Sequence, residues 1–187
     1  YAENMIARAS AAVGETNNRF IHDDVLAPRS LQGPYDAVIC IRVLINLRNL
    51  NEQRKAVANL LELLKPGGRL ILAEGFTEGF AQLTKLRESV GLPAIEPAAI
   101  NFYSATTDLL PQLQERCDLV DTFHLGAYDY LTRVVYPMVA GHENVRHNSV
   151  FSERAWELAQ AFNPDDFEPL SRIRGYVFQM RDKSQES

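Results

Sequence analysis

The sequence has little cysteine. Among its 187 residues only Cys40 and Cys117 carry thiols, and two cysteines are too few for the disulfide framework that stabilises small secreted domains. Cys40 lies in the middle of an apolar run, where cysteine is usually reduced and buried. We therefore expect free thiols and a reducing compartment, the cytoplasm.

Long apolar runs and an excess of basic residues are missing as well. The longest apolar stretches are interrupted by Arg or Asn well before the about 20 residues that a membrane-spanning helix needs. The formal net charge of −5 gives no electrostatic reason to expect a nucleic-acid partner. The spacing of the histidines does not suggest a metal site. The sequence therefore predicts no membrane partner, no nucleic-acid partner and no metal.

What the sequence does contain is a clear central unit, residues 35–74. Two short apolar runs, 35–41 and 69–74, flank a segment, 51–64, whose apolar residues recur at helical spacing. A strand, a helix and a second strand joined by short turns indicate a parallel sheet. Asn49 with Glu52 three residues later, or Asn51 alone, is expected to cap the helix, and Lys65-Pro66-Gly67-Gly68 is expected to end it.

The remaining elements follow from shorter patterns. The residues just after the first central strand (Arg42, Val43 and Asn46) and at the end of the second (Glu74) should line a ligand site, because ligands bind beyond the carboxyl ends of parallel strands. Elsewhere we expect helices over 1–13, 80–90, 104–115 and 152–162, and strands over 20–25, 119–124 and 174–180. Ser104 should cap the helix over 104–115, and the core face of the helix over 152–162 should consist of Trp156, Leu158, Ala159 and Phe162. The last strand is suited to a sheet edge or an antiparallel pair. Residues 127–140 fit either a helix or a strand.

The order of these elements resembles a known family. Tyr35-Asp36-Ala37-Val38-Ile39-Cys40, and the helix end that reads Leu64-Lys65-Pro66-Gly67-Gly68-Arg69-Leu70-Ile71-Leu72-Ala73-Glu74, are similar to the fourth and fifth strands of class I S-adenosylmethionine-dependent methyltransferases. Residues 1–6 resemble the helix after the family's second strand, and 22–25 resemble the end of its third. The resemblance implies one α/β domain, 1–187. Its Rossmann-like sheet is mostly parallel with an antiparallel C-terminal pair. A helical cap is expected at 75–116 and a helical insertion at 125–170.

One part of the family pattern has no counterpart in the printed residues. The glycine-rich loop after the first strand and the acidic residue that ends the second would both precede Tyr1. Without those strands, the parallel sheet would have an exposed apolar edge at its centre. The resemblance therefore implies that a strand, a short glycine-rich turn and an Asp or Glu precede Tyr1. A naturally short protein is the alternative.

The resemblance also implies a cofactor, S-adenosylmethionine, and residues that hold it. Asp24 is the expected acceptor for the adenine amine, or else a turn carboxylate that bonds its own backbone. Tyr1 and Met5 would pack against the adenine, unless they belong to the core. Val25, Ile41 and Arg42 complete the expected cofactor residues. Arg42 could instead form a structural salt bridge, because an unpaired buried charge is costly.

Residues for the substrate and for catalysis are less specific. The catalytic group is unknown, with Arg42, Glu74 and His124 as candidates. Glu74 would orient the substrate or hold Arg42 in place, and His124 is a potential base, as are His142 and His147. The expected substrate residues lie in or near the cap: Arg87, Asn101, Tyr103 and Tyr136. Arg87 would clamp a carboxylate or phosphate, or else be a solvated helix charge.

The implied reaction is in-line methyl transfer to a hydroxyl or carboxylate of a small polar metabolite, with a sugar as one example. Such an enzyme mainly supplies proximity and orientation, so no conspicuous catalytic motif is needed. Two other hypotheses stay open. One is a non-catalytic methyltransferase-like subunit or fragment that needs a partner chain. The other is a nicotinamide-dependent oxidoreductase, which Lys65-Pro66-Gly67-Gly68 and the antiparallel last strands fit poorly. The sequence also leaves a homo-oligomer open.

Overall fold

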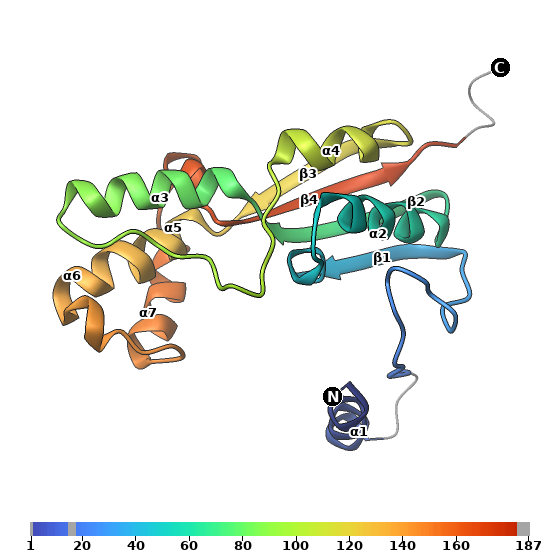
Figure 1. Cartoon of the computed structure of the whole chain (residues 1–187), viewed down its shortest axis with the longest axis horizontal. Helices are drawn as coiled ribbons and strands as arrows, with labels where there is room; N and C mark the ends of the chain where they lie inside the picture. Colours follow the sequence, from blue (N-terminus) through green and yellow to red (C-terminus); the bar gives the residue numbers. More distant parts are fainter. Residues whose placement is uncertain (1, 15–17, 183–187) are drawn as a thin grey trace.

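A mixed four-stranded sheet forms the centre of the computed structural model, which describes residues 2–14 and 18–182 (Figure 1). Its strands are β1 (Tyr35–Ile41), β2 (Leu64–Gly75), β3 (Cys117–His124) and β4 (Ile173–Met180), in the order β1-β2-β4-β3. β1 and β2 are parallel, whereas β4 is antiparallel to both β2 and β3. The expected α/β class and the antiparallel C-terminal pair are therefore confirmed.

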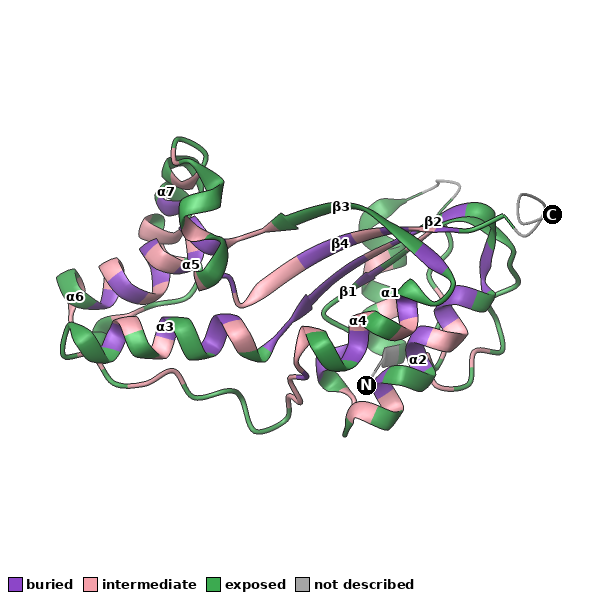
Figure 2. Ribbon diagram, turned by 90° about the horizontal axis from the view of Figure 1, so that it is seen from above, coloured by how far each residue is buried: buried purple, intermediate pink, exposed green. Residues whose placement is uncertain are grey.

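The register of the strands decides which residues share one end of the sheet. Ile41 at the end of β1 lies opposite Ala73, and Glu74 lies opposite Arg174, which in turn lies opposite His124. The carboxyl ends of β1 and β2 thus meet the start of β4. β4 lies inside the sheet, so its alternation reflects two antiparallel neighbours and not a sheet edge. The edges are β1 and β3, and Figure 2 shows that β3 is largely exposed while β2 is buried toward its carboxyl end.

Two helices, α2 (Leu50–Glu62) and α4 (Thr106–Gln114), supply the apolar side chains that pack against the sheet. The cap of α2 is the first of the two expected alternatives, because the Asn49 side chain accepts the Glu52 N–H at 3.0 Å. Buried side chains from both helices and from all four strands form one core: Cys40, Ala56, Val57, Leu60, Leu61, Leu70, Leu72, Leu109, Leu113, Cys117 and Phe178.

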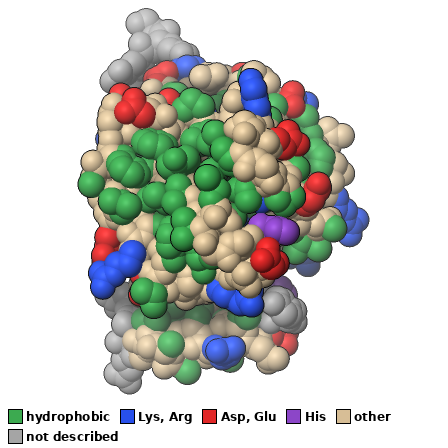
Figure 3. Space-filling view, turned by 90° about the vertical axis from the view of Figure 1, so that its left-hand side faces the viewer, with side chains coloured by type: hydrophobic (Ala, Val, Ile, Leu, Met, Phe, Trp, Pro, Cys, Tyr) green, Lys and Arg blue, Asp and Glu red, His purple; other side chains and the backbone are tan. Residues whose placement is uncertain are grey.

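A second group of helices lies beyond the end of the sheet at which β2 and β3 finish (Figure 1). It comprises α3 (Thr77–Ser89), α5 (Gly126–Tyr130), a π-helical segment (Leu131–Val135), α6 (Tyr136–Ala140) and α7 (Val150–Ala159). Residues 127–140 are therefore helical. Short 3-10 segments occupy Leu44–Asn46, His142–Asn144 and Pro164–Leu170. Figure 3 looks onto this end of the molecule, where hydrophobic side chains gather on the surface; Met138 and Val139 of α6 are exposed.

Two glycines allow this helical group to reach the sheet. A Cβ at Gly79 of α3 would overlap the Ser171 carbonyl, and a Cβ at Gly126 of α5 would overlap the Phe167 carbonyl. Both carbonyls belong to the segment that leads into β4. Since backbone cannot move aside as a flexible side chain can, these contacts require glycine.

Several expectations about individual elements are wrong. Residues 20–25 do not form a strand, because a strand needs a hydrogen-bonding neighbour and this stretch does not pair with β1. Ser104 does not cap α4: the cap residue is Ala105, and the Thr106 N–H donates to the Glu78 carboxylate at 2.8 Å. On α7 the buried residue is Ala155, whereas Trp156 is 50 % exposed, because only one narrow face of this helix meets its neighbours.

α1 (Ala2–Val13) has the expected helical span, and Tyr1 lies outside the described residues. The helix stands apart from the sheet, joined to it by the segment that precedes β1 (Figure 1). Its apolar residue Met5 is 59 % exposed. The division into a cap at 75–116 and an insertion at 125–170 stays a prediction. Within the first range, α3 lies with the distal helices, but Leu109 and Leu113 of α4 belong to the sheet core.

Candidate functional site

The turn that follows β1 is the most unusual piece of backbone at the sheet's carboxyl end. Arg42 adopts a φ of 52°, a left-handed conformation that residues other than glycine rarely adopt and that often marks functional sites. Its N–H donates to the Ala73 carbonyl at 2.9 Å, and its own carbonyl accepts from Asn46 Nδ2 at 2.7 Å. The Arg42 guanidinium makes no hydrogen bond or ion pair with any residue that the structure describes, so it is free to contact a ligand.

Glu74, at the end of β2, holds this turn. Its side chain is 1 % exposed, and its carboxylate accepts the N–H groups of Val43 at 2.7 Å, Leu44 at 3.0 Å and Ile45 at 3.4 Å. Burial raises the pKa of Glu74, and the three N–H donors oppose that rise. Of the two expected roles, orienting a substrate or holding Arg42, these contacts fit the second. Glu74 acts on the backbone after Arg42 and not on its guanidinium.

The same carboxylate lies beside the buried thiol of Cys40. Sγ of Cys40 donates to Glu74 Oε1 at 3.6 Å. Burial, together with the charge of Glu74, raises the pKa of the Cys40 thiol to about 12. Both cysteines are free and buried, which confirms the expectation of a reduced, buried thiol at Cys40. Cys40 is therefore a packing residue and a donor to Glu74, with no character of a nucleophile.

A polar cavity opens next to the Arg42 turn. It has a volume of about 340 Å³, and a smaller cavity of about 60 Å³ adjoins it and shares Arg42, Arg133, Arg172 and Ile173 with it. The distal helices and the loop before α7 supply most of the other lining residues of the larger cavity: Tyr128, Thr132, Tyr136, Val145, Arg146, His147, Asn148 and Ser152. The cavity thus lies between the carboxyl ends of β1 and β2 and the helical group, where this type of sheet binds ligands.

Only one of these arginines has a carboxylate partner in the described part of the chain. Arg172 donates to Asp129 from Nε at 3.0 Å and from Nη2 at 2.7 Å, and its backbone N–H adds a third bond at 2.9 Å. Asp129 is 2 % exposed and is fully used by this residue. Arg133 has a buried Nε with no hydrogen-bond partner. Burial lowers the pKa of Arg133, and the charge of Arg172 lowers it further, while the charge of Asp129 opposes the change.

A third cavity lies at the open edge of β1. It has a volume of about 170 Å³, and Asp24, Val25, Ile39 and Val43 are among its lining residues. Asp24 Oδ1 accepts the Leu26 N–H at 2.9 Å, which is the turn contact expected as the alternative role. Its second carboxylate oxygen makes no hydrogen bond with any residue described here. Asp23 and Asn59 also line this slot, and the rest of its lining is apolar. The free oxygen of Asp24 is a suitable acceptor for an amine on a planar ring.

Asp23 organises the loop before β1. Its carboxylate accepts the N–H groups of Arg29, Ser30 and Leu31 at 2.8–3.2 Å. These bonds, that from Ser30 first, lower the pKa of Asp23. The loop that presents Asp24 is therefore held by its neighbour.

The expected substrate residues occupy different positions. Tyr103 lines the small cavity and Tyr136 the large one. Asn101 donates to the Tyr103 hydroxyl at 3.1 Å. Arg87 is 7 % exposed, so it is not a solvated charge; it donates to the backbone carbonyls of Pro93, at 2.7 Å, and Arg133. These bonds occupy Arg87 in joining α3 to the loop after it and to the π-helical segment.

The remaining expected residues lie at the margins of this region. Ile41, which ends β1, is 60 % exposed at the open edge of the sheet, and Met5 lies on the separate helix α1. Sequence reasoning missed Arg133, Arg146 and Arg172. A signal for Arg133 was present, because it is the one charged residue of the segment Leu131–Val135, in which Leu131, Val134 and Val135 are apolar. Arg172 could not be found from the sequence, since it precedes β4 and its partner Asp129 lies on α5, more than 40 residues earlier in the chain.

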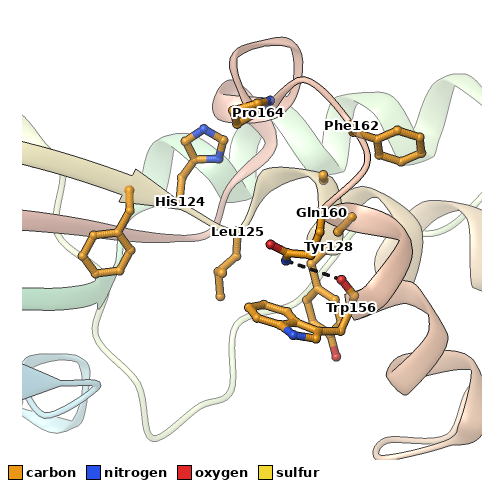
Figure 4. A pocket seen from close by; sticks show the side chains of 10 residues that line it. His124, Leu125, Tyr128, Trp156, Gln160, Phe162 and Pro164 are labelled. Atoms are coloured by element: carbon orange, nitrogen blue, oxygen red, sulfur yellow. Dashed lines mark hydrogen bonds between the residues drawn. The ribbon is translucent and has the colours of Figure 1, made fainter.

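His124 belongs to a different cavity. It ends β3, three strand spacings or about 14 Å from β1. It lines a space of about 320 Å³ together with Tyr128, Trp156 and Phe162 (Figure 4). Its Nδ1 accepts the Gly126 N–H at 3.3 Å. The structure therefore does not bring His124 to the Arg42 turn. The histidine that lines the polar cavity is His147, whereas His142 forms a surface pair with Glu143 at 3.2 Å.

The sequence predicts neither a metal site nor a membrane-spanning helix. No group of three or more His, Cys, Asp or Glu side chains in residues 2–14 and 18–182 is arranged to hold a metal ion. In the same ranges, no helix is long and apolar enough to cross a membrane.

Comparison with known proteins adds independent information. Residues 1–68 match the family model described as a methyltransferase domain. Over 96 residues the chain is 41 % identical to the ubiquinone/menaquinone biosynthesis C-methyltransferase UbiE of Erwinia tasmaniensis, a match that covers 51 % of this chain and 31 % of that protein. The chain spans less than half the length of the curated relatives that it matches.

Solved structures share the fold. Magnesium protoporphyrin IX methyltransferase from Synechocystis, crystallised with S-adenosylhomocysteine, superimposes with a TM-score of 0.52 at 16 % identity and covers 97 % of this chain and 59 % of its own. The [4+2]-cyclase SpnF gives a TM-score of 0.53 at 16 % identity, covering 96 % and 61 %. The resemblance to class I methyltransferases and the Rossmann-like fold are confirmed. Because a cyclase shares the fold, the reaction has to be argued from the site.

Proposed function

We propose that this chain belongs to an S-adenosylmethionine-dependent methyltransferase that methylates an oxygen of a small polar metabolite. The observation that supports this best is the meeting, at the carboxyl ends of β1 and β2, of the left-handed Arg42 turn with a polar cavity. In folds of this kind the cofactor and the acceptor share that crevice. The match of residues 1–68 to a methyltransferase domain supports the same assignment.

The residues at the open edge of β1 suit the nucleoside end of the cofactor. The slot lined by Val25, Ile39 and Val43 offers apolar walls, and Asp24 offers a free carboxylate oxygen to an adenine amine. When bound, the cofactor supplies an activated methyl group. The printed residues contain no counterpart of the family's glycine-rich loop or of the acid that binds the ribose, so Asp24, Val25, Ile41 and Arg42 are proposed for one side of the cofactor only.

On the acceptor side, residues of this chain bind and orient the methyl acceptor and take up its proton. Tyr136 and Thr132 on the distal helices face the same cavity as Arg42, so an acceptor held there would present its oxygen to the end of β1. Holding reactants in line contributes much of the rate of such a transfer. A hydroxyl acceptor must also lose a proton, and His147 is the histidine that lines this cavity.

We propose oxygen and not carbon as the methylated atom because the cavity is polar. UbiE of Erwinia tasmaniensis is named for C-methylation in quinone biosynthesis. An uncharged quinone would leave the guanidinium groups around the cavity without partners, which is unfavourable in a partly buried site. A polar metabolite with a hydroxyl or carboxylate would satisfy them. We therefore propose O-methylation of a small metabolite, in the cytoplasm, with no nucleic-acid partner.

Equilibrium dialysis with radiolabelled S-adenosylmethionine tests the first part of this proposal. We expect saturable binding that S-adenosylhomocysteine displaces and that ATP and NAD do not. Incubation of the protein with labelled donor and pooled small metabolites, followed by mass spectrometry, should then give products heavier by one methylene unit. Saturable binding of NAD in place of the methyl donor would contradict the assignment and favour an oxidoreductase.

One observation favours the alternative of a non-catalytic subunit. β1 is an open edge, and its side chains Ile39 and Ile41 are 62 % and 60 % exposed. An exposed apolar edge strand is usually covered, and a partner chain is one way to cover it. The same dialysis separates the two functions, because a subunit without a catalytic role has no need to bind the methyl donor.

A further inference from the structure

The large polar cavity has a one-sided charge. Four arginines line it, Arg42, Arg133, Arg146 and Arg172, and within the described part of the chain no Asp or Glu lines either this cavity or the small one that adjoins it. Among the described residues, Asp129 is the carboxylate that pairs with an arginine of this cavity; Arg172 takes its hydrogen bonds, and its charge also acts on Arg133. The net charge of the chain is nevertheless −5, so this concentration of positive charge does not follow from the composition.

The arginines without carboxylate partners are placed to bind something. Among the described residues, Arg146 donates only to the backbone carbonyls of Glu143 and Val145, both from Nη1 at 3.3 Å, which leaves its other guanidinium donors without a partner there. Arg42 uses none of its side-chain donors on described residues. Arg133 is the most demanding, because its buried Nε has no hydrogen-bond partner among the described residues, and the positive charges of Arg172 and Arg87 lie nearby, with Asp129, which Arg172 already binds, as the opposing negative charge. A buried cation in this situation is unfavourable unless an anion accompanies it.

We propose that the methyl acceptor of this protein carries an anionic group, a carboxylate or a phosphate, which Arg133 and Arg146 bind in the polar cavity. This inference rests on the proposed function and specifies the class of substrate. The guanidinium fork matches the paired oxygens of both groups. The volume of about 340 Å³ accommodates a small metabolite.

The rest of the lining fixes how such a ligand lies. Tyr128 and Tyr136 supply aromatic walls, and Thr132, Asn148 and Ser152 supply neutral hydrogen-bonding groups. Arg146 lies on the loop before α7, and Arg133 on the π-helical segment. Arg42, at the end of β1, lines the same cavity, so a metabolite held by Arg133 and Arg146 lies in the space next to which the methyl donor is proposed to lie.

Calorimetric titration with two matched pairs of probes tests the inference without the methyl donor. The carboxylate pair is 4-hydroxybenzoate and 4-hydroxybenzamide, and the phosphate pair is glucose 6-phosphate and glucose. We expect at least one anionic probe to bind about tenfold or more tightly than its neutral counterpart, since hydrogen bonds to charged groups are the stronger ones. The pair that shows the difference identifies the anion. Equal affinities within both pairs, or no binding of either anionic probe at millimolar concentration, would overturn the inference.

A pair of exposed arginines provides the variants. Arg146→Gln changes a residue that contacts only local carbonyls, so the fold should survive, which far-UV circular dichroism would check. Arg154→Gln is the matched control, because Arg154 is exposed on α7, pairs with Glu157 at 2.7 Å and does not line the cavity. We expect Arg146→Gln to weaken the anionic probe about five- to tenfold and to leave the neutral probe unchanged. An equal effect of both variants would overturn the inference.

The outcome is distinguishable from the outcome for the proposed function. Dialysis with S-adenosylmethionine reports on the donor side and involves neither probe pair. Anion binding without donor binding would refute the methyltransferase and leave the anion site standing. Donor binding without anion selectivity would refute the anion site and leave the methyltransferase assignment standing.

Discussion

The role of Glu74 can be tested by replacing it in two ways. Its carboxylate accepts two close N–H donors, Val43 at 2.7 Å and Leu44 at 3.0 Å, and one distant donor, Ile45 at 3.4 Å. Glu74→Ala leaves both close donors without an acceptor, and Leu44 is 1 % exposed. An unsatisfied buried donor costs about 1–3 kcal/mol. Glu74→Ala also removes a buried charge, which offsets part of the cost of the two unsatisfied donors. We therefore expect a net loss of about 3 kcal/mol in the free energy of unfolding.

Glu74→Gln separates the hydrogen bonds from the charge. The amide oxygen can still accept from Val43 and Leu44, and only the long bond to Ile45 is lost, so we expect a loss of about 1 kcal/mol or less. Urea denaturation followed by far-UV circular dichroism measures both variants against a total stability of about 5–15 kcal/mol. If the two variants lose the same free energy, or if Glu74→Ala loses less than about 1 kcal/mol, the carboxylate does not hold the turn.

The pH dependence of stability, compared between the wild type and Glu74→Gln, adds an independent check. Burial raises the pKa of Glu74 in the folded protein, so between the unfolded and the folded pKa the folded state binds more protons than the unfolded state. This contribution to stability is therefore present below the unfolded pKa, about 4.3, and is lost as the pH rises through the folded pKa. Glutamine does not titrate. The variant should gain stability relative to the wild type as the pH rises from about 4.3, and a constant difference would contradict the raised pKa.

Three further predictions concern other residues. Asp24→Ala should weaken binding of S-adenosylmethionine about tenfold, measured by calorimetry, and unchanged affinity would refute the proposed adenine contact. Cys40, whose thiol pKa is raised to about 12, should not react with a disulfide reagent at pH 8 in the folded protein but should react in urea; rapid labelling without urea would show that the thiol is accessible. Asp129→Ala should cost about 3–5 kcal/mol, because it leaves Arg172 partly buried without a partner. Removal of the exposed acid in the pair Arg174–Glu168 should cost less than about 1 kcal/mol, and equal costs would contradict this difference.

The central unit was predictable because its signals are local. The alternation of β1, the helical spacing of α2 and the Asn49–Glu52 cap depend on residues within a few positions of one another. The left-handed Arg42 was not predictable, since Arg rarely adopts that conformation and the carboxylate that supports the turn comes from the next strand. The position of Glu74 at the site was expected from the strand end, but its buried contacts with backbone N–H groups were not.

Errors occurred where an element depends on a neighbour. Residues 20–25 have the composition of a strand but no partner strand among the described residues, so they remain a loop held by Asp23. The buried face of α7 is set by Ala155, which a hydrophobicity pattern ranks below Trp156. The requirement for glycine at 79 and at 126 arises only because the segment before β4 crosses both helices.

By itself, the sequence determined the order of strand, helix and strand at the centre, the reduced thiols and the resemblance to a methyl-donor family, because periodicity, capping and turn chemistry act over short stretches of chain. Only the tertiary structure decided which polar groups meet. Arg42, Arg133 and Arg172 come from distant segments and share one cavity. The carboxylate of Asp129 accepts its side-chain hydrogen bonds from Arg172. Charge acts through space, so the excess of positive charge at this site exists only once the chain has folded.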